Sequence, residues 1–387
     1  MKQLKTKLDT LCVLREMLKD TVIEKLACYL ENPTSSAYAG FVAVLYQANG
    51  GNLSLHIKDL CEKSENVYVR LCGQGKEVPE YMAESLREEL KTMQALADAT
   101  SQALKSLLSS HGFLPDFANS PTDLLTDYLL RAQNVGKYGY GIYATHPMFY
   151  VGEDGAIVPV QHPDQTKLSD LVDYERERKI ILENTHALLD GKPAANILLT
   201  GDAGTGKSST VKAIGNALFS EGLRIIEVRK DQLRAIPVLL NELSTNPLKF
   251  VLFIDDLSFL KDDDNFNALK AVLEGSVSAK SKNVVIYATS NRRHIIKEKF
   301  SDREGDDVHR NDTMQELVSL SERFGIHITF SKPNKETFLH IVRHLAQAEG
   351  LSLPTAELEA GAERLALERG GRSARLARQY IDGLLSR

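Results

Sequence analysis

One loop, GDAGTGKS at residues 201–208, constrains the fold of this chain more than any other feature. It fits the pattern G-x-x-x-x-G-K-[ST] at every fixed position, between an apolar run, Asn196–Thr200, and a helix-prone segment, Ser209–Phe219. Its glycines let backbone N–H groups point at phosphate oxygens, and the following helix adds the positive end of its dipole. We therefore predict a strand–loop–helix unit that binds a nucleotide. The residues predicted to bind it are Gly201, Asp202, Ala203, Gly204, Thr205, Gly206, Lys207, Ser208 and Ser209.

Two of these residues are given chemical roles. Lys207 is predicted to contact the β- and γ-phosphates and to take part in catalysis, and the Ser208 hydroxyl is predicted to bind Mg²⁺. A second motif follows, since the apolar run 249–254 ends in Asp255 and Asp256, which is the Walker B pattern. Asp255 is predicted to hold the Mg²⁺ shell through water, and Asp256 to orient or deprotonate the attacking water.

A third apolar run, 284–290, ends in polar residues, and Asn291 follows it. Ligands of open α/β sheets bind outside the carboxyl ends of the strands. We therefore expect Asn291 beside the γ-phosphate, where it positions water, although a strand that ends in Ser-Asn often simply enters a turn. Arg292 and Arg293 either contact nucleic acid or pair with acids at a subunit face, and we favour the second interpretation.

The chain divides into four segments by its sequence pattern. Residues 1–110 have helical periodicity, 111–165 form a linker with a small β element around Asp154-Gly155, 166–332 alternate strands with helices, and 333–387 are helical again. The alternation predicts a five-stranded parallel sheet with both faces covered. The charged segment 297–312 is predicted to be a loop. The expected strands are 141–143, 148–151 and 156–160 in the linker and 196–200, 224–228, 250–254, 284–288 and 326–330 in the sheet.

Composition excludes several classes of protein. The net charge of −5 does not indicate bulk attraction to nucleic acid or to anionic membranes. No apolar run approaches the 18 or so residues of a membrane span, so no membrane partner is expected. The first 20 residues lack the apolar block of a signal peptide, so we expect a cytoplasmic protein. The four cysteines form no CxxC pair and are expected to be free, buried thiols: Cys12, Cys28, Cys61 and Cys72.

The three motifs and the helical C-terminal part resemble the AAA+ ATPases. More narrowly, four strings are similar to a bacterial group of AAA+ ATP-binding proteins, domain of unknown function 815, over about residues 136–387. The resemblance implies an α/β fold of the P-loop NTPase (AAA+) type with a C-terminal helical lid, after a mostly helical N-terminal domain. It also implies ATP and Mg²⁺ as cofactors. Many AAA+ proteins carry Glu at the position of Asp256, but Asp-Asp is usual in this group. The strings are QHPDQTKLSDLVDYERER (161–178), FIDDLSF (253–259), LKAVLEG (269–275) and YATSNRRH (287–294).

The resemblance assigns two further arginines. Arg323 looks like an arginine finger that reaches the γ-phosphate bound to a neighbouring subunit, with a surface salt bridge as the alternative. Arg375 looks like the sensor-2 arginine of the last helix, with Arg372 in reserve. Arg369, Arg372, Arg375 and Arg378 recur every three residues. This spacing is typical of a helix face that binds nucleic acid or, as we favour, of a solvated helix face with one functional member.

These features lead to one preferred function. The chain is expected to bind and hydrolyse ATP, to assemble as a homo-oligomer and to remodel a macromolecular partner that the N-terminal helices recognise. The alternatives are a nucleotide-dependent binding switch with little hydrolysis, and an ATPase associated with DNA, similar to helicase loaders or transposition helpers. Nucleic acid is thus an open but not a favoured partner. His340 and His344 are four residues apart on a helix but lack a third metal ligand, so we assign them no metal.

Overall fold

The computed structural model describes residues 2–109, 112–257, 264–274, 282–291 and 322–386. The predicted loop 297–312 and the arginines at 292 and 293 lie outside these residues. The chain forms two compact units, one made of residues 1–145 with 246–248 and the other of 146–245 with 249–387. Among the described helices, none has the length and apolar character that a membrane span requires.

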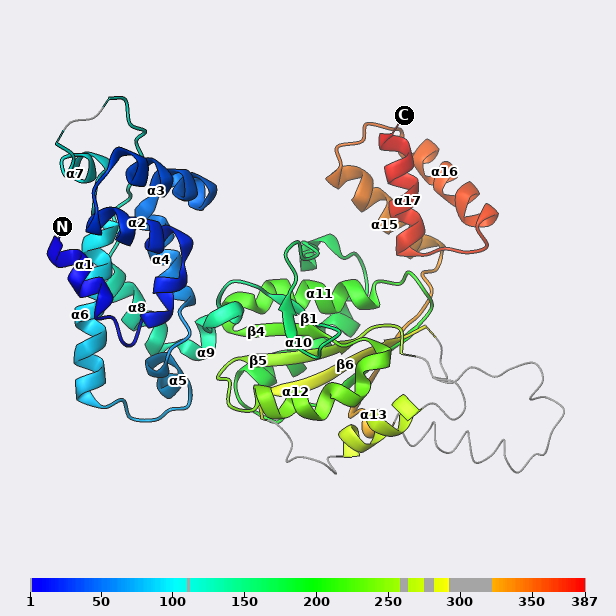
Figure 1. Ribbon diagram of the computed structural model, residues 1–387. Helices are drawn as coiled ribbons and strands as arrows, with labels where there is room; N and C mark the ends of the chain where they lie inside the picture. The colour runs from blue at the N-terminus through cyan, green and yellow to red at the C-terminus, as the bar shows by residue number, and fades with distance from the viewer. Residues whose placement is uncertain (1, 110–111, 258–263, 275–281, 292–321, 387) are drawn as a thin grey trace. The chain divides into compact units, whose positions relative to one another are not determined.

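The first unit is helical, as predicted (Figure 1). Several of its helices begin where a polar side chain caps the first turn: Asp20, Thr34 and Asn52 each accept a hydrogen bond from a backbone N–H two or three residues ahead. The helices are α1 (Lys2–Asp9), α2 (Thr21–Glu31), α3 (Ser35–Gln47), α4 (Leu53–Lys63), α5 (Val67–Gly73), α6 (Glu80–Ala97), α7 (Ser101–Lys105), α8 (Leu124–Gln133) and α9 (Val135–Tyr138), with 3₁₀ turns at Arg15–Lys19, Asn49–Gly51 and Gly141–Ala144.

The strand predicted over 141–143 is wrong, because this segment is a 3₁₀ helix. Gly139 and Gly141 adopt φ angles of +71° and +58°, which an extended strand cannot accommodate. The prediction of buried thiols is also only partly right. All four cysteines are free, but Cys61 is buried whereas Cys12 and Cys28 are exposed.

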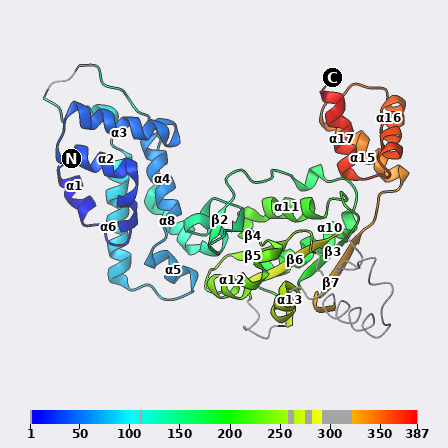
Figure 2. The ribbon, with the colours of Figure 1, turned by 45° about the vertical axis from the view of Figure 1, so that its right-hand side comes forward.

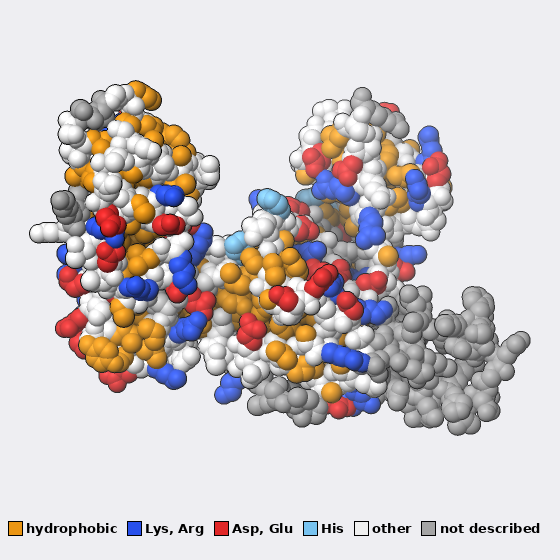
Figure 3. Space-filling model, viewed as in Figure 1, with side chains coloured by type: hydrophobic (Ala, Val, Ile, Leu, Met, Phe, Trp, Pro, Cys, Tyr) orange, Lys and Arg blue, Asp and Glu red, His pale blue; other side chains and the backbone are white. Residues whose placement is uncertain are grey.

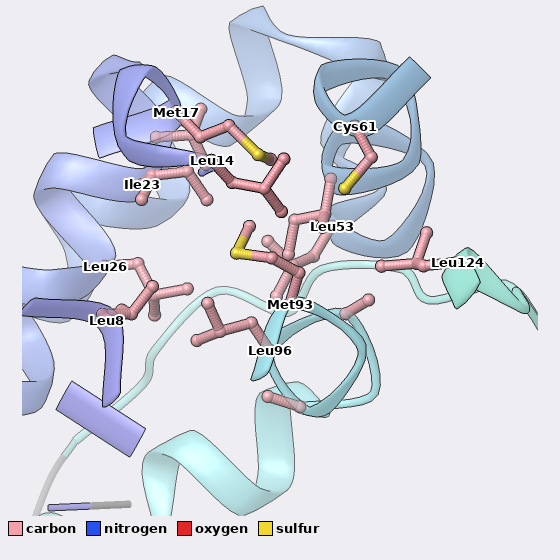
Figure 4. Packing of buried hydrophobic residues seen from close by; sticks show 14 of the residues in the cluster. Leu8, Leu14, Met17, Ile23, Leu26, Leu53, Cys61, Met93, Leu96 and Leu124 are labelled. Carbon is pink, nitrogen blue, oxygen red and sulfur yellow. The ribbon is translucent and has the colours of Figure 1, made fainter. Parts of the chain in front are cut away.

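Most buried apolar residues described in the helical unit belong to one cluster. Figure 4 shows side chains from α1, α2, α4 and α6 converging on one another, among them Leu8, Leu26, Leu53 and Met93, none of which is accessible to solvent. Burying a Leu side chain contributes about 1.5–3 kcal/mol, so this cluster gives the unit a core of its own.

The second unit is built on a seven-stranded sheet, with strand order β2-β1-β4-β5-β6-β3-β7. The five predicted parallel strands are present and adjacent. The predicted hairpin also forms, but it extends this same sheet, since β1 pairs parallel with β4 and antiparallel with β2. The sheet therefore has seven strands rather than five. The strands are β1 (Met148–Val151), β2 (Ile157–Pro159), β3 (Ile197–Gly201), β4 (Leu223–Glu227), β5 (Lys249–Ile254), β6 (Val284–Ser290) and β7 (Ile326–Phe330).

Helices cover both faces of the sheet (Figures 1 and 2). On one face, α10 (Glu175–Leu189) and α11 (Lys207–Leu218) share an apolar cluster with alternate residues of the strands, such as Leu199 and Phe253. In β3, β4, β5 and β6 the intervening residues are buried as well, on the face that α12 (Ile236–Leu243) and α13 (Asp264–Glu274) cover. The C-terminal helices pack on one another around Phe338 and Ile381, and these are α15 (Lys335–Ala348), α16 (Thr355–Glu368) and α17 (Ala374–Leu385).

Candidate nucleotide-binding site

The glycine-rich loop connects β3 to α11, as predicted, and its shape depends on its glycines. Gly201, Gly204 and Gly206 have φ angles of +135°, +77° and +91°. A Cβ atom on Gly201 would lie 2.0 Å from the backbone oxygen of Phe330, and one on Gly204 would lie 3.0 Å from the Cβ of Arg375. Only glycine therefore lets β7 and the last helix approach the loop this closely.

Gly201→Ala should lower the free energy of unfolding of the sheet unit by about 2–4 kcal/mol, because backbone strain adds to an overlap with Phe330 that side-chain movement cannot relieve. Gly191→Ala is the matched control, since Gly191 also has a left-handed φ of +70° but has no atom within 4 Å of the added Cβ. Urea titration measures the loss, and faster amide hydrogen exchange in β3 and β7 locates it. Equal losses for the two variants would contradict the close approach.

The side chain of Lys207 lies inside the loop, with 4% of the residue exposed. Its Nζ donates to the backbone oxygens of Gly201 (2.9 Å) and Asp202 (2.8 Å) and to Oδ1 of Asn291 (3.0 Å). Burial lowers the pKa of Lys207, while the carboxylates of Asp255, Asp202 and Asp256 oppose this shift. The ammonium group is thus held at the point where the loop, which supplies the N–H groups, meets the polar end of β6.

The predicted metal-binding residues are brought together. Oδ1 of Asp255 accepts hydrogen bonds from the hydroxyls of Ser208 (2.6 Å) and Thr289 (2.5 Å). A carboxylate and a hydroxyl next to a phosphate site are the oxygen ligands that Mg²⁺ takes together with substrate phosphates and water. The described residues contain no group of three or more His, Cys, Asp or Glu side chains that could hold a metal without such a substrate. This donor set therefore fits Mg²⁺ that arrives with a nucleotide.

Asp256 and Asn291 are also in contact. Nδ2 of Asn291 donates to Oδ1 of Asp256 (2.8 Å), while its Oδ1 accepts from Lys207, so one amide joins the predicted water-activating acid to the predicted phosphate-binding lysine. Asp256 has a φ of +53°, which is uncommon for a residue with a side chain. Its backbone N–H donates to the hydroxyl of Thr289 (2.9 Å), and this bond holds the turn after β5 against β6.

These residues line a cavity of about 700 Å³ beside the loop. Its lining includes the polar residues Lys207, Ser208, Asp255, Asp256 and Asn291, and it also includes an apolar wall that sequence analysis missed. The apolar groups come from the segment before α10 and from α15, and they are Leu171, Val172, Ile341 and Leu345. A cavity that combines these polar groups with an apolar wall suits a ligand with phosphates and a flat ring system.

Tyr174 and Arg178 line the same cavity and were not predicted either. The Tyr174 hydroxyl donates to the backbone oxygen of Ser331 (2.5 Å), its ring lies 5.1 Å from that of Phe330, and burial raises its pKa to about 12. Asp173, which like Tyr174 has a left-handed φ, faces His340 of α15 with an O–N distance of 3.3 Å. The one sequence signal for these residues was the string 161–178, to which no role could be given.

The two candidate sensor-2 arginines have different surroundings. The backbone N–H of Arg375 donates to the oxygen of Gly204 (3.2 Å), and its exposed side chain lines the cavity. Arg372 instead forms two hydrogen bonds with Glu363 (2.8 and 2.7 Å), which raise its pKa, and it is not among the described residues that line the cavity. Arg378 donates to Glu349 (2.6 Å). The geometry therefore favours Arg375 over Arg372 as the candidate sensor-2 arginine.

Arg323 lies away from the other predicted residues. It precedes β7, forms an ion pair with Glu274 at the end of α13, and is not among the described residues that line the cavity. The sequence prediction placed its function at the nucleotide of a neighbouring subunit, and its position in this chain is compatible with that role.

The fold and the cavity together define a class of protein. A parallel sheet with β3 between β6 and β7, a G-x-x-x-x-G-K-S loop at the carboxyl end of β3, and C-terminal helices beside that loop are the P-loop NTPase fold of the AAA+ type. The chain belongs to the family described as "Protein of unknown function (DUF815)", whose model matches residues 144–387. The predicted fold class and family are thus confirmed.

Comparison with solved structures gives remote similarities. The RuvB Holliday junction branch migration motor of Thermotoga maritima is 14% identical, with a TM-score of 0.35, over 57% of this chain and 72% of that chain. Two single-residue variants of that RuvB have identities of 15% and 14% and TM-scores of 0.35 and 0.34 over the same shares. No curated protein matches the chain.

Proposed function

We propose that this protein binds and hydrolyses ATP with Mg²⁺ as cofactor. One observation carries the proposal: residues from three separate segments of the chain, Lys207, Asp256 and Asn291, are joined by hydrogen bonds at the mouth of the glycine-rich loop, and Asp255 beside them accepts a hydrogen bond from Ser208 of the loop. A buried ammonium group beside carboxylates at the start of a helix is the arrangement that phosphate and Mg²⁺ binding require. The apolar wall formed by Leu171 and Ile341 favours a nucleoside triphosphate over inorganic phosphate.

In the proposed mechanism each residue has a separate task. The loop N–H groups and Lys207 bind the phosphate chain, and Lys207 stabilises the charge that develops on the γ-phosphate. Mg²⁺, when bound, neutralises phosphate charge, and Ser208 and Asp255 would hold it. Asp256 accepts a proton from the attacking water, which Asn291 orients. Arg375, beside Gly204 on α17, contacts the phosphates and thereby links the C-terminal helices, acting as a lid, to nucleotide binding.

The proposal extends to assembly and partners. We infer a homo-oligomer in which Arg323 of one subunit acts on the nucleotide of the next, and in which the helical unit recognises the macromolecule that is remodelled. The proposed segments are those predicted from sequence, namely helices in 1–110, a linker over 111–165, the nucleotide-binding core over 166–332 and the lid over 333–387, except that the hairpin within 111–165 is part of the main sheet. Four free cysteines suit the reducing cytoplasm, and no membrane partner is proposed.

Two alternatives are weighed against observations. Asp256 favours a binding switch with little hydrolysis. Its side chain is shorter than the Glu that many AAA+ proteins carry at this position, and its carboxylate already accepts a hydrogen bond from Asn291. A DNA partner is less well supported, because Figure 3 shows acidic and basic side chains interspersed over this face of both units rather than a basic field. In addition, Arg372 and Arg378 of the C-terminal arginine row are paired with glutamates.

Steady-state Mg-ATP hydrolysis per subunit, measured over a range of protein concentrations, tests the proposal. We expect the specific activity to rise with concentration and then to saturate, because subunits complete one another's sites. ATP binding without hydrolysis at any concentration would favour the switch. Failure to bind ATP at all would contradict the proposed function.

A further inference from the structure

Arg323 and the nucleotide site lie at opposite edges of the sheet. In the parallel register of β3 and β7, Gly201 is opposite Phe330 and Ile197 is opposite Ile326, so the site lies at the carboxyl end of these strands. Arg323 precedes Ile326 at their amino end. Five strand residues span about 16 Å, and Arg323 lies further back still. Any nucleotide that its guanidinium contacts must therefore be bound to another molecule.

Helix α13 connects these two edges. Its chain leaves the carboxyl end of β5, where Asp255 lies, and the helix packs against the 3₁₀ helix η6 (Lys230–Ala235) that follows the carboxyl end of β4. Its last residue, Glu274, forms the ion pair with Arg323 at the amino edge. Eleven helical residues span about 16 Å, which matches the depth of the sheet. Leu269 and Leu273, exposed by 0% and 7%, hold this helix in place.

The ion pair has a physical consequence for Arg323. The exposed fractions of the two side chains are 26% and 37%, so the pair is partly shielded from water. A free arginine side chain loses rotamer entropy when it binds a phosphate. Its N–H donors form a rigid fork, so a carboxylate that engages some of them fixes the plane of all of them. A carboxylate on an anchored helix can thus orient the guanidinium before a phosphate arrives.

We propose that Glu274 is a positioning residue, which orients Arg323 for the γ-phosphate of a nucleotide bound to a second copy of this chain. This inference rests on the proposed ATPase function. It also assigns a function to α13, because this helix connects the acidic end of β5 to Arg323, which acts on the next subunit.

Glu274→Ala should lower kcat for ATP about 10- to 100-fold at saturating protein, since misplacement of a catalytic group by about 1 Å can cost 10²-fold. KM and ATP affinity should stay unchanged, and Glu274→Gln, which keeps an acceptor oxygen, should lose less. Combining Glu274→Ala with Arg323→Ala should add nothing to the loss from Arg323→Ala alone. The control is Glu359→Ala, which removes the partner of Arg343 in the lid and should leave kcat unchanged.

Mixed oligomers decide whether Glu274 acts across the subunit boundary. Glu274→Ala subunits are co-expressed with Lys207→Ala subunits under different tags and purified through both tags. Activity should return, because Lys207→Ala subunits carry an intact Glu274–Arg323 pair and Glu274→Ala subunits carry an intact site. Mixed oligomers of Arg323→Ala and Lys207→Ala subunits serve as the positive control.

Each of the remaining possible results contradicts a different part of the argument for Glu274. Unchanged or higher kcat for Glu274→Ala, or no recovery in mixed oligomers when the Arg323→Ala control recovers, excludes a positioning role for Glu274. If neither mixture recovers activity, or if the differently tagged subunits do not co-purify, Arg323 does not act on a second copy. The proposal that the chain hydrolyses ATP is not affected by this result. Absence of hydrolysis by the unmodified chain overturns the proposed function itself.

Discussion

Lys207→Ala should weaken ATP binding about 30- to 3,000-fold and remove measurable hydrolysis. Only 4% of Lys207 is exposed, its ammonium nitrogen lies within 3.0 Å of three oxygen atoms, and the loop 201–208 contains no other Lys or Arg. Removing one partner of a buried, hydrogen-bonded charge pair costs about 2–5 kcal/mol, and each 1.4 kcal/mol corresponds to a tenfold change in affinity. Calorimetric titration with Mg-ATP measures the binding, and release of inorganic phosphate measures hydrolysis.

The control for this variant lies on the same helix. Lys212 is a half-buried residue of α11 whose charge acts on Asp164 and which does not line the cavity. Lys212→Ala should therefore keep both ATP affinity and hydrolysis. If Lys207→Ala bound Mg-ATP as tightly as the unmodified chain, the cavity beside the loop would not be the nucleotide site.

The parts of the site that sequence analysis predicted are those in which short motifs and strand order suffice. The loop 201–208 is contiguous, and Asp255 and Asn291 each follow a strand, so a parallel sheet brings both to the edge where ligands bind. The residue types then predicted the chemistry. The same reasoning predicted the five parallel strands, since four of them are apolar runs buried on both faces and β7 buries Ile328 and Phe330 on one face.

Other parts of the site and the fold depend on contacts between residues far apart in the chain, which the sequence does not reveal. The apolar wall of the cavity joins Leu171 to Ile341, which are 170 positions apart, and neither carries a functional side chain. The choice between Arg375 and Arg372 required the position of Glu363, which engages one of them. The hairpin's place in the main sheet depended on the pairing of β1 with β4, which short apolar runs do not encode.

Arg323→Ala should lower the rate of ATP hydrolysis about 10³- to 10⁵-fold, the range that arginine fingers supply, while ATP affinity stays unchanged. Affinity should survive because Arg323 lies at the amino edge of the sheet, away from the cavity of its own subunit. Single-turnover hydrolysis and calorimetric titration measure the two quantities. Arg343→Ala is the matched control, because Arg343 also forms an ion pair with a glutamate, Glu359, but within the lid. Normal hydrolysis by Arg323→Ala would show that each subunit completes its own site, and the Glu274–Arg323 pair would then have only a structural role.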